Sequence, residues 1–151
     1  MIGEMLEPLG LYLARQRSGG TIDYSSPGYT ALLDSAAPLG GKGVAIPLDG
    51  KLENDLPALS ATIDERTLAV SLVNPHNPSG TLSDGAALDR FILDAAKRTL
   101  IDEAYLEYDD LARRSAIRMS AQVPMSWCFA HLPRSIGWQP FRSAMPLRPR
   151  P

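Results

Sequence analysis

Residues 68–80 read Leu-Ala-Val-Ser-Leu-Val-Asn-Pro-His-Asn-Pro-Ser-Gly, an apolar run followed at once by a polar, proline-rich string. The run at residues 68–73 has the length and apolar character of a buried parallel strand. The two Asn-Pro steps force an extended, turn-making backbone. They would hold the amide of Asn77 rigidly at the end of the strand, where it could donate to a phenolate oxygen. A purely structural turn is the alternative interpretation.

A second polar string, Asp102-Glu103-Ala104-Tyr105, follows the short apolar segment at residues 100–101. A carboxylate at a strand end can pair with a protonated ring nitrogen if the geometry is good. Tyr105 could add a hydrogen bond to the same ring oxygen as Asn77. The separation of 102 − 77 = 25 residues leaves room for one helix and the next strand, so both strings would face one crevice. The alternative is a helix-capping Asp102 followed by a surface Glu and a core Tyr.

Segments with helical and strand-like apolar spacing alternate around these strings. The predicted helices are one carrying Leu6, Leu9 and Leu13, one from a Ser26 cap to Ala36, one from an Asn54 cap to Ile63, and one from Ser83 or Asp84 to Ala95. Residues 43–47 predict a strand, whereas the polar, glycine-bearing residues 17–26 predict a loop. This alternation predicts an α/β fold with a parallel sheet and ligands beyond the carboxyl ends of its strands.

The composition of the 151-residue chain excludes several function classes. A net charge of −2 gives no argument for nucleic acid or an anionic membrane surface as a partner, and no apolar run approaches the about 20 residues of a membrane helix. The N-terminus lacks the pattern of a signal peptide. The single cysteine, Cys128, excludes an internal disulfide, and only His76 and His131 could join it at a metal. We therefore expect a cytoplasmic protein without a metal site.

Taken together, the two strings resemble a known family. Asn-Pro-x-Asn-Pro-Ser/Thr-Gly, one βα unit and then Asp-Glu-Ala-Tyr look like the fold-type I, pyridoxal-phosphate-dependent aminotransferases of class I and II. The Leu-Glu-Tyr at residues 106–108 and the Pro-Gly-Tyr at residues 27–29 look most like the histidinol-phosphate aminotransferase branch. The resemblance covers residues 3–118 and implies a partial large, cofactor-binding domain, with a parallel-rich sheet and flanking helices. Related decarboxylases acting on phosphorylated amino acids share both motifs, so the reaction class stays open.

The resemblance also implies which residues contact pyridoxal 5'-phosphate. Family members hold the cofactor's ring oxygen with the residues that match Asn77 and Tyr105. The residue that matches Asp102 pairs with the pyridine nitrogen and keeps it protonated. An aromatic residue that matches Tyr29 stacks on the ring; an ordinary core aromatic on a helix is the alternative for Tyr29. Backbone N–H groups at a helix N-terminus hold the phosphate, and Gly3-Glu4 matches the end of that phosphate-binding loop.

The family's reactive group, a lysine amine that forms a Schiff base, is not found where the resemblance implies it. It should follow Asp-Glu-Ala-Tyr by roughly 25 to 30 residues, in a string like Thr-Phe-Ala-Lys. The lysines of this chain, Lys42, Lys51 and Lys97, all precede Asp102. No catalytic residue is therefore assigned, and we expect the chain to be inactive.

Residues 119–151 lack periodicity and predict an irregular tail, beyond a partial cofactor domain at residues 1–118. Codons chosen for residues 130–135 and shifted by one base read Thr-Phe-Ala-Lys-Ile. Codons for residues 137–145 shifted in the same way read Leu-Ala-Ala-Leu-Pro-Ile-Gly-Tyr. Both strings look like the family's lysine segment and the stretch after it. Our hypothesis is a change of reading frame near residues 119–122, which the nucleotide sequence of the gene would test.

Three hypotheses about the function of the chain follow from these observations. The first is an aminotransferase fragment, whose ancestor moved an amino group from an amino acid to a keto acid or a phosphorylated ketone. The second is a non-catalytic module that binds pyridoxal phosphate or another partner, and the third is a degenerate gene product without function. The resemblance also implies a homodimer, whose interface would be largely missing here, so exposed apolar surface is expected.

Overall fold

The computed structural model describes residues 2–95, 99–106, 115–116, 119 and 127–130. The helices are α1 (Ile2–Gln16), α2 (Ala31–Ala36), the short 3-10 helix η1 (Ala37–Leu39), α3 (Leu56–Thr62) and α4 (Gly85–Ala95). The strands are β1 (Thr21–Ser26), β2 (Lys42–Pro47), β3 (Thr67–Val73), β4 (Thr99–Glu103) and β5 (Trp127–Ala130).

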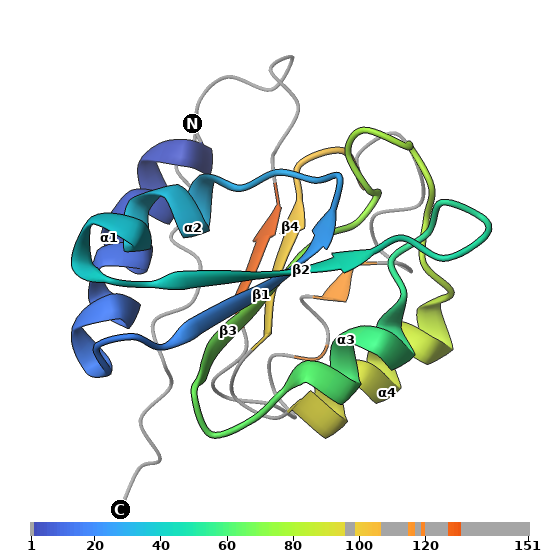
Figure 1. Cartoon of the computed structure of the whole chain (residues 1–151). Helices are drawn as coiled ribbons and strands as arrows, with labels where there is room; N and C mark the ends of the chain where they lie inside the picture. The colour runs from blue at the N-terminus through green and yellow to red at the C-terminus, as the bar shows by residue number, and fades with distance from the viewer. Residues whose placement is uncertain (1, 96–98, 107–114, 117–118, 120–126, 131–151) are drawn as a thin grey trace, which may run out of the picture.

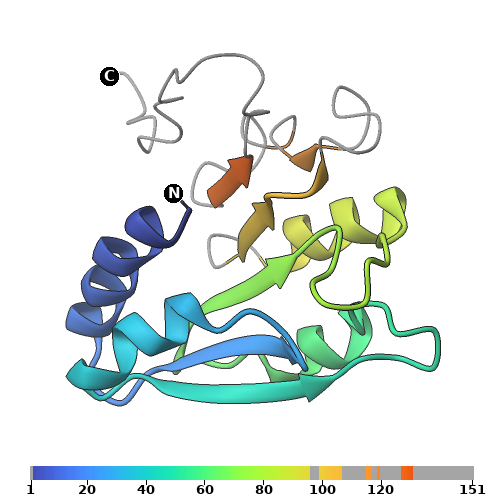
Figure 2. The ribbon, with the colours of Figure 1, turned by 90° about the horizontal axis from the view of Figure 1, so that it is seen from above.

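The strands form one parallel sheet in the order β2-β1-β3-β4-β5 (Figure 1). Helices α1 and α2 cover one face of the sheet, and α3 and α4 cover the other, as the view from above shows (Figure 2). This arrangement confirms the predicted α/β fold with a parallel sheet and flanking helices.

Alternating strand residues contribute to two separate hydrophobic cores. Ile22, Ala69 and Leu100 pack with α1 and α2. Their neighbours Val70 and Ile101 pack with α3 and α4, together with other strand residues of the same parity. Because successive side chains on a strand point to opposite faces, this alternation fixes the face on which each strand residue lies.

The prediction of a loop at residues 17–26 is wrong, because Thr21–Ser26 forms β1 in the interior of the sheet. The polar side chains that suggested a loop are buried and find distant partners. Asp23 accepts a hydrogen bond from Thr62 Oγ1 at 2.8 Å, and Ser25 Oγ donates to Asn54 Oδ1 at 2.7 Å. Buried polar groups are tolerated when they are hydrogen-bonded, and partners so far along the chain leave no local signal.

Two predicted helix caps are also wrong. Helix α2 begins at Ala31 after Thr30, which makes no side-chain cap. Ser26 is instead the last residue of β1, and a cis peptide bond joins it to Pro27 in the following loop. Asp55 caps α3 by accepting from the Ala58 amide at 2.9 Å. Its neighbour Asn54 is buried instead. The predicted cap of α4 is confirmed, because Asp84 Oδ1 accepts from the Ala87 amide at 2.9 Å.

Helix α1 extends beyond the predicted Leu6, Leu9 and Leu13 at both ends, and it contains Pro8 after its first turn. Gly10 lies where α1 meets α2. A Cβ atom at Gly10 would overlap Ser35 Oγ and lie 2.7 Å from the Leu32 carbonyl oxygen. The close approach of the two helices therefore requires glycine at this position.

The C-terminal part differs in one respect from an irregular tail. Trp127–Ala130 forms β5, which pairs in parallel with β4 in the register Ile101↔Cys128 and Asp102↔Phe129. Apart from these residues and Met119, the predicted tail lies outside the described residues. The proposed division of the chain at residue 118 therefore stays a prediction.

Candidate functional site

The two sequence motifs start side by side at the carboxyl edge of the sheet. Val73, the last residue of β3, is in register with Asp102 on β4. The next amide, that of Asn74, donates to the Asp102 carbonyl oxygen at 2.9 Å. The loop that carries Asn77 and the turn that carries Tyr105 therefore leave the sheet from adjacent strands, as the topology predicted (Figure 1).

The adjacent acids of the second motif point to opposite faces. Asp102 has the parity of Leu100 and so lies on the α1/α2 face. Its side chain is 4% exposed, and Oδ1 accepts a hydrogen bond from the Ala104 amide at 3.0 Å. Because Asp102 belongs to a strand, the helix-capping alternative is wrong.

Glu103 lies on the α3/α4 face and is fully buried, so the alternative of a surface Glu is also wrong. Its two carboxylate oxygens accept from Ser115 Oγ and from the Ala116 amide, both at 2.6 Å. These contacts tie β4 to the segment at residues 115–116. Glu103 is therefore a structural carboxylate, and of the two acids only Asp102 is placed for a ligand on the α1/α2 face.

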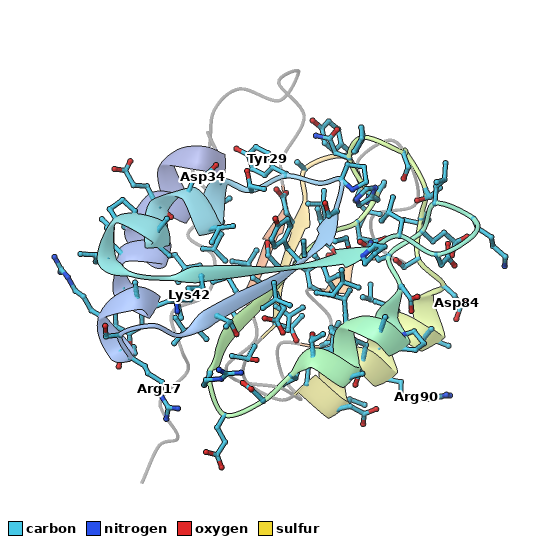
Figure 3. The ribbon with its side chains drawn as sticks, in the orientation of Figure 1. Arg17, Tyr29, Asp34, Lys42, Asp84 and Arg90 are labelled. Atoms are coloured by element: carbon cyan, nitrogen blue, oxygen red, sulfur yellow. The ribbon has the colours of Figure 1, made fainter. Side chains whose placement is uncertain are left out.

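The candidate aromatic residues are exposed near this edge. Tyr29 lies in the loop between β1 and α2 with 41% of its surface exposed (Figure 3). This exposure argues against a core aromatic on a helix. Tyr105 follows β4 in a turn and is 44% exposed, which contradicts the alternative of a core Tyr. Asn77 is half-buried in the loop after β3.

Gly3 and Glu4 lie in the first turn of α1. Helix α1 spans 15 residues, or about 22 Å, and joins β1 through residues 17–20, at the edge where the strands begin. Its N-terminus therefore lies at the opposite, carboxyl edge of the sheet (Figures 1 and 2). The backbone of Gly3 and Glu4, the Tyr29 loop and Asp102 thus share one face and one edge of the sheet.

Sequence reasoning missed the role of Asn54, which it assigned to a helix cap. The buried Asn54 side chain accepts from Ser25 Oγ at 2.7 Å and donates to the Val73 carbonyl at 3.0 Å and to Ser83 Oγ at 3.3 Å. The Ser83 amide in turn donates to Asn74 Oδ1 at 2.9 Å. This network fixes the ends of β1 and β3 relative to the loop that carries the first motif. The sequence spacing of these residues does not predict this network.

From the sequence, His76 is considered only as a possible metal ligand, and its place in the fold is not predicted. The structure buries it, with 2% of its surface exposed, and Nδ1 lies 2.8 Å from Ser79 Oγ. Burial lowers the pKa of His76, and the backbone of Pro27, which favours the charged ring, opposes this shift. His76 is therefore a neutral, internal side chain next to Asn77.

Both the sequence and the fold of the chain match a known family. Residues 9–117 match the family model described as aminotransferase class I and II. The chain belongs to this aminotransferase family. Among curated relatives, the histidinol-phosphate aminotransferase of Moorella thermoacetica is 35% identical over 92 residues, which are 60% of this chain and 24% of that protein. The aromatic amino acid aminotransferase of Nocardia farcinica is 42% identical over 67 residues, which are 43% of this chain and 19% of that protein.

Solved aminotransferase structures share the fold. The histidinol-phosphate aminotransferase of Sinorhizobium meliloti, solved in complex with pyridoxal-5'-phosphate, aligns with a TM-score of 0.70 and 23% identity over 83% of this chain and 35% of that one. The enzyme from Clostridium acetobutylicum gives a TM-score of 0.68 and 22% identity over 83% and 37%. The present chain thus spans about a quarter or less of the length of these curated relatives and about a third of the length of the solved ones.

No group of three or more His, Cys, Asp or Glu side chains that could hold a metal occurs among the residues that the structure describes. Within that same part of the chain, no helix is both long and apolar enough to cross a membrane.

Proposed function

We propose that this chain is the cofactor-binding part of a pyridoxal-phosphate-dependent aminotransferase of the histidinol-phosphate type. The observation that carries the proposal is the placement of Asp102, a buried carboxylate at the carboxyl edge of β4, on the face shared with Tyr29 and the start of α1. Burying a carboxylate is costly unless a partner charge or hydrogen bonds compensate. A protonated ring nitrogen would add a charged partner to the hydrogen bond that Asp102 already accepts from the Ala104 amide.

The donor set fits the cofactor's chemistry. Asp102 would hold the proton on the pyridine nitrogen, and the hydrogen bond that it accepts from the Ala104 amide orients its carboxylate. Asn77 and Tyr105 would donate to the ring oxygen, and Tyr29 would stack on the ring. Backbone N–H groups of Gly3 and Glu4, in the first turn of α1, would bind the phosphate. When bound, the cofactor supplies an electron sink for the bonds at the substrate carbon.

We further infer that the chain holds the cofactor without a covalent bond to lysine and is inactive in amino transfer. Lys42 is exposed at the start of β2, the edge of the sheet opposite to the site (Figure 3). Lys51 is exposed in the turn between β2 and α3, and Lys97 lies outside the described residues. The amino donor, a phosphorylated ketone as acceptor, and a homodimer are proposals for the complete enzyme that this chain resembles.

The test is a titration of the purified full chain with pyridoxal phosphate, followed by absorbance. We expect saturable binding, and we expect Asp102→Asn to raise the dissociation constant at least about tenfold, or about 1.4 kcal/mol. Asp94→Asn is the matched control, because Asp94 is an exposed carboxylate on α4, across the sheet. The control should bind like the parent chain.

Each other outcome has a definite meaning. Absence of saturable binding by the parent chain would contradict the cofactor site and favour a degenerate product. An equal loss in both variants would remove the role of Asp102. Retention of the cofactor after borohydride reduction and denaturation would show a covalent lysine and overturn the inferred inactivity.

A further inference from the structure

His76 occupies an unusual position for a residue in a connecting loop. It lies between the two Asn-Pro steps of the first motif, directly before Asn77. Its ring is among the most completely buried side chains that the structure describes. Loops usually run over the surface, so an internal imidazole here implies that two segments are packed against it.

One side of the ring organises its own loop. Nδ1 contacts Ser79 Oγ, and the hydroxyls of Ser79 and Thr81 donate to the Leu52 carbonyl at 2.8 and 2.7 Å. Each hydroxyl has a single proton, so a Ser79 that donates to Leu52 must accept from Nδ1. The His76 amide also donates to the Thr81 carbonyl at 2.7 Å, and the His76 carbonyl accepts from the Gly80 amide at 2.7 Å. The loop at residues 76–81 is thus closed around His76.

The other side of the ring faces the loop that carries Tyr29. A Cβ atom at Gly28 would lie 3.6 Å from Nε2 of His76, so this ring edge lies against the Gly28 backbone. Nε2 has no hydrogen-bond partner within the part of the chain that the structure describes. Packing against Gly28 therefore dominates the contact on this side, and the backbone of Pro27 adds a polar contribution. The Gly28 backbone is held against β1, because the same Cβ would also overlap the Ser25 carbonyl oxygen.

We propose that His76 is a positioning residue that sets the separation between the Tyr29 loop and the Asn77 loop. The inference rests on the proposed function, in which Tyr29 stacks on the cofactor ring while Asn77 binds its oxygen. No single helix or strand joins the two loops, because the Tyr29 loop follows β1 and the Asn77 loop follows β3. The imidazole fills the space between them. Loss of the ring would let the Tyr29 loop move relative to the rest of the site.

The first experiment needs no cofactor. Amide hydrogen exchange of the free full chain is compared between the parent and His76→Ala. We expect exchange at Asp34, whose amide donates to the carbonyl of Thr30 in the Tyr29 loop at 2.9 Å, to accelerate about tenfold or more, and exchange within α4 to stay unchanged. Unchanged exchange at Asp34 would overturn the proposal, whether or not the chain binds pyridoxal phosphate.

Two further variants separate the sides of the ring and replace His76→Ala if that chain does not fold. His76→Phe keeps the ring shape that faces Gly28 but removes Nδ1, whereas His76→Asn keeps an amide near Nδ1 and removes the outer ring. We expect His76→Phe to restore slow exchange at Asp34 and His76→Asn to leave it fast. The reverse order would assign the effect to the Ser79 hydrogen bond and would contradict positioning by shape.

The second experiment is a double-mutant cycle on pyridoxal phosphate affinity. We expect His76→Ala to raise the dissociation constant about fivefold in the parent chain and less than about twofold in a Tyr29→Leu background, because contacting residues couple whereas distant ones add. The same change combined with Tyr105→Phe should be additive. Additivity with Tyr29→Leu would overturn the proposal, whereas absence of binding by the parent chain would remove only the proposed function.

Discussion

At the scale of single residues, the buried carboxylate of Asp23 gives the fold a pH dependence. Asp23 lies on β1 away from the carboxyl edge, and its Oδ1 has no hydrogen-bond partner in the described part of the chain. Burial raises the pKa of Asp23 above 3.8, and the hydroxyl of Thr62 opposes this shift less strongly. The folded chain therefore favours the protonated acid. Its contribution to stability is greatest below the unfolded pKa and declines as the pH rises through the folded value.

We therefore predict that Asp23→Asn stabilises the chain at pH 7 by on the order of 1 kcal/mol, because a neutral amide removes an incompletely paired buried charge. The gain should shrink as the pH falls towards 4. Urea unfolding of both chains at several pH values measures it. Asp49→Asn is the control, and it should lower the stability at pH 7 where Asp23→Asn raises it. The amides of Glu53 and Lys51 lower the pKa of Asp49 and so favour its charged form. A stability difference for Asp23→Asn that is independent of pH would contradict the assignment.

Residue-scale prediction from the sequence worked where chemistry is local. Asn77, Asp102 and Tyr105 were placed at the ends of adjacent strands by strand-length apolar runs and by the 25 residues between the motifs. Asn54 and His76 were missed because their partners lie far along the chain or in another loop. Burial of a polar side chain is a property of the assembled fold, and no local pattern reports it.

At the scale of elements, the contact between α1 and α2 depends on a glycine. Alanine has the higher helix propensity, by about 1 kcal/mol. Even so, we predict that Gly10→Ala destabilises the chain by about 1–3 kcal/mol, because the added methyl group overlaps Ser35 and forces the helices apart.

Gly85→Ala is the matched control. Gly85 begins α4, and a Cβ atom there would have no neighbour within 4 Å. We expect this variant to be stabilised by about 0.5–1 kcal/mol. Thermal or urea unfolding of both variants checks the pair. Stabilisation by Gly10→Ala would show that α1 does not approach α2 as closely as described.

Element prediction succeeded where apolar periodicity and burial agree. The strands β2, β3 and β4 and the helices α3 and α4 fall within two residues of the predicted limits. It failed for β1, whose Asp23 and Ser25 are polar yet buried, and for the start of α2, where Ser26-Pro27 mimics a helix start. It also missed β5, since four residues without periodicity contain too little pattern to mark a strand.

At the scale of the whole molecule, residues 2–95 and 99–106 build most of the sheet and the edge at which we propose the cofactor site. The comparisons establish its family, and it spans about a third of the solved relatives. The residues that would supply a lysine and read a substrate are not among those the structure describes. The frame change near residues 119–122 stays a hypothesis, and a lysine codon split between Pro133 and Arg134 in the alternative frame is what it requires of the gene.

In the proposed site, Asp102 binds the pyridine nitrogen of the cofactor ring, and Asn77 and Tyr105 bind the ring oxygen. A crystal structure of the full chain grown with pyridoxal phosphate tests it most directly. We predict a carboxylate oxygen of Asp102 within about 3 Å of the pyridine nitrogen, and the side chains of Asn77 and Tyr105 at the ring oxygen. A ring bound elsewhere, or three side chains too far apart to reach one ring, would contradict the account.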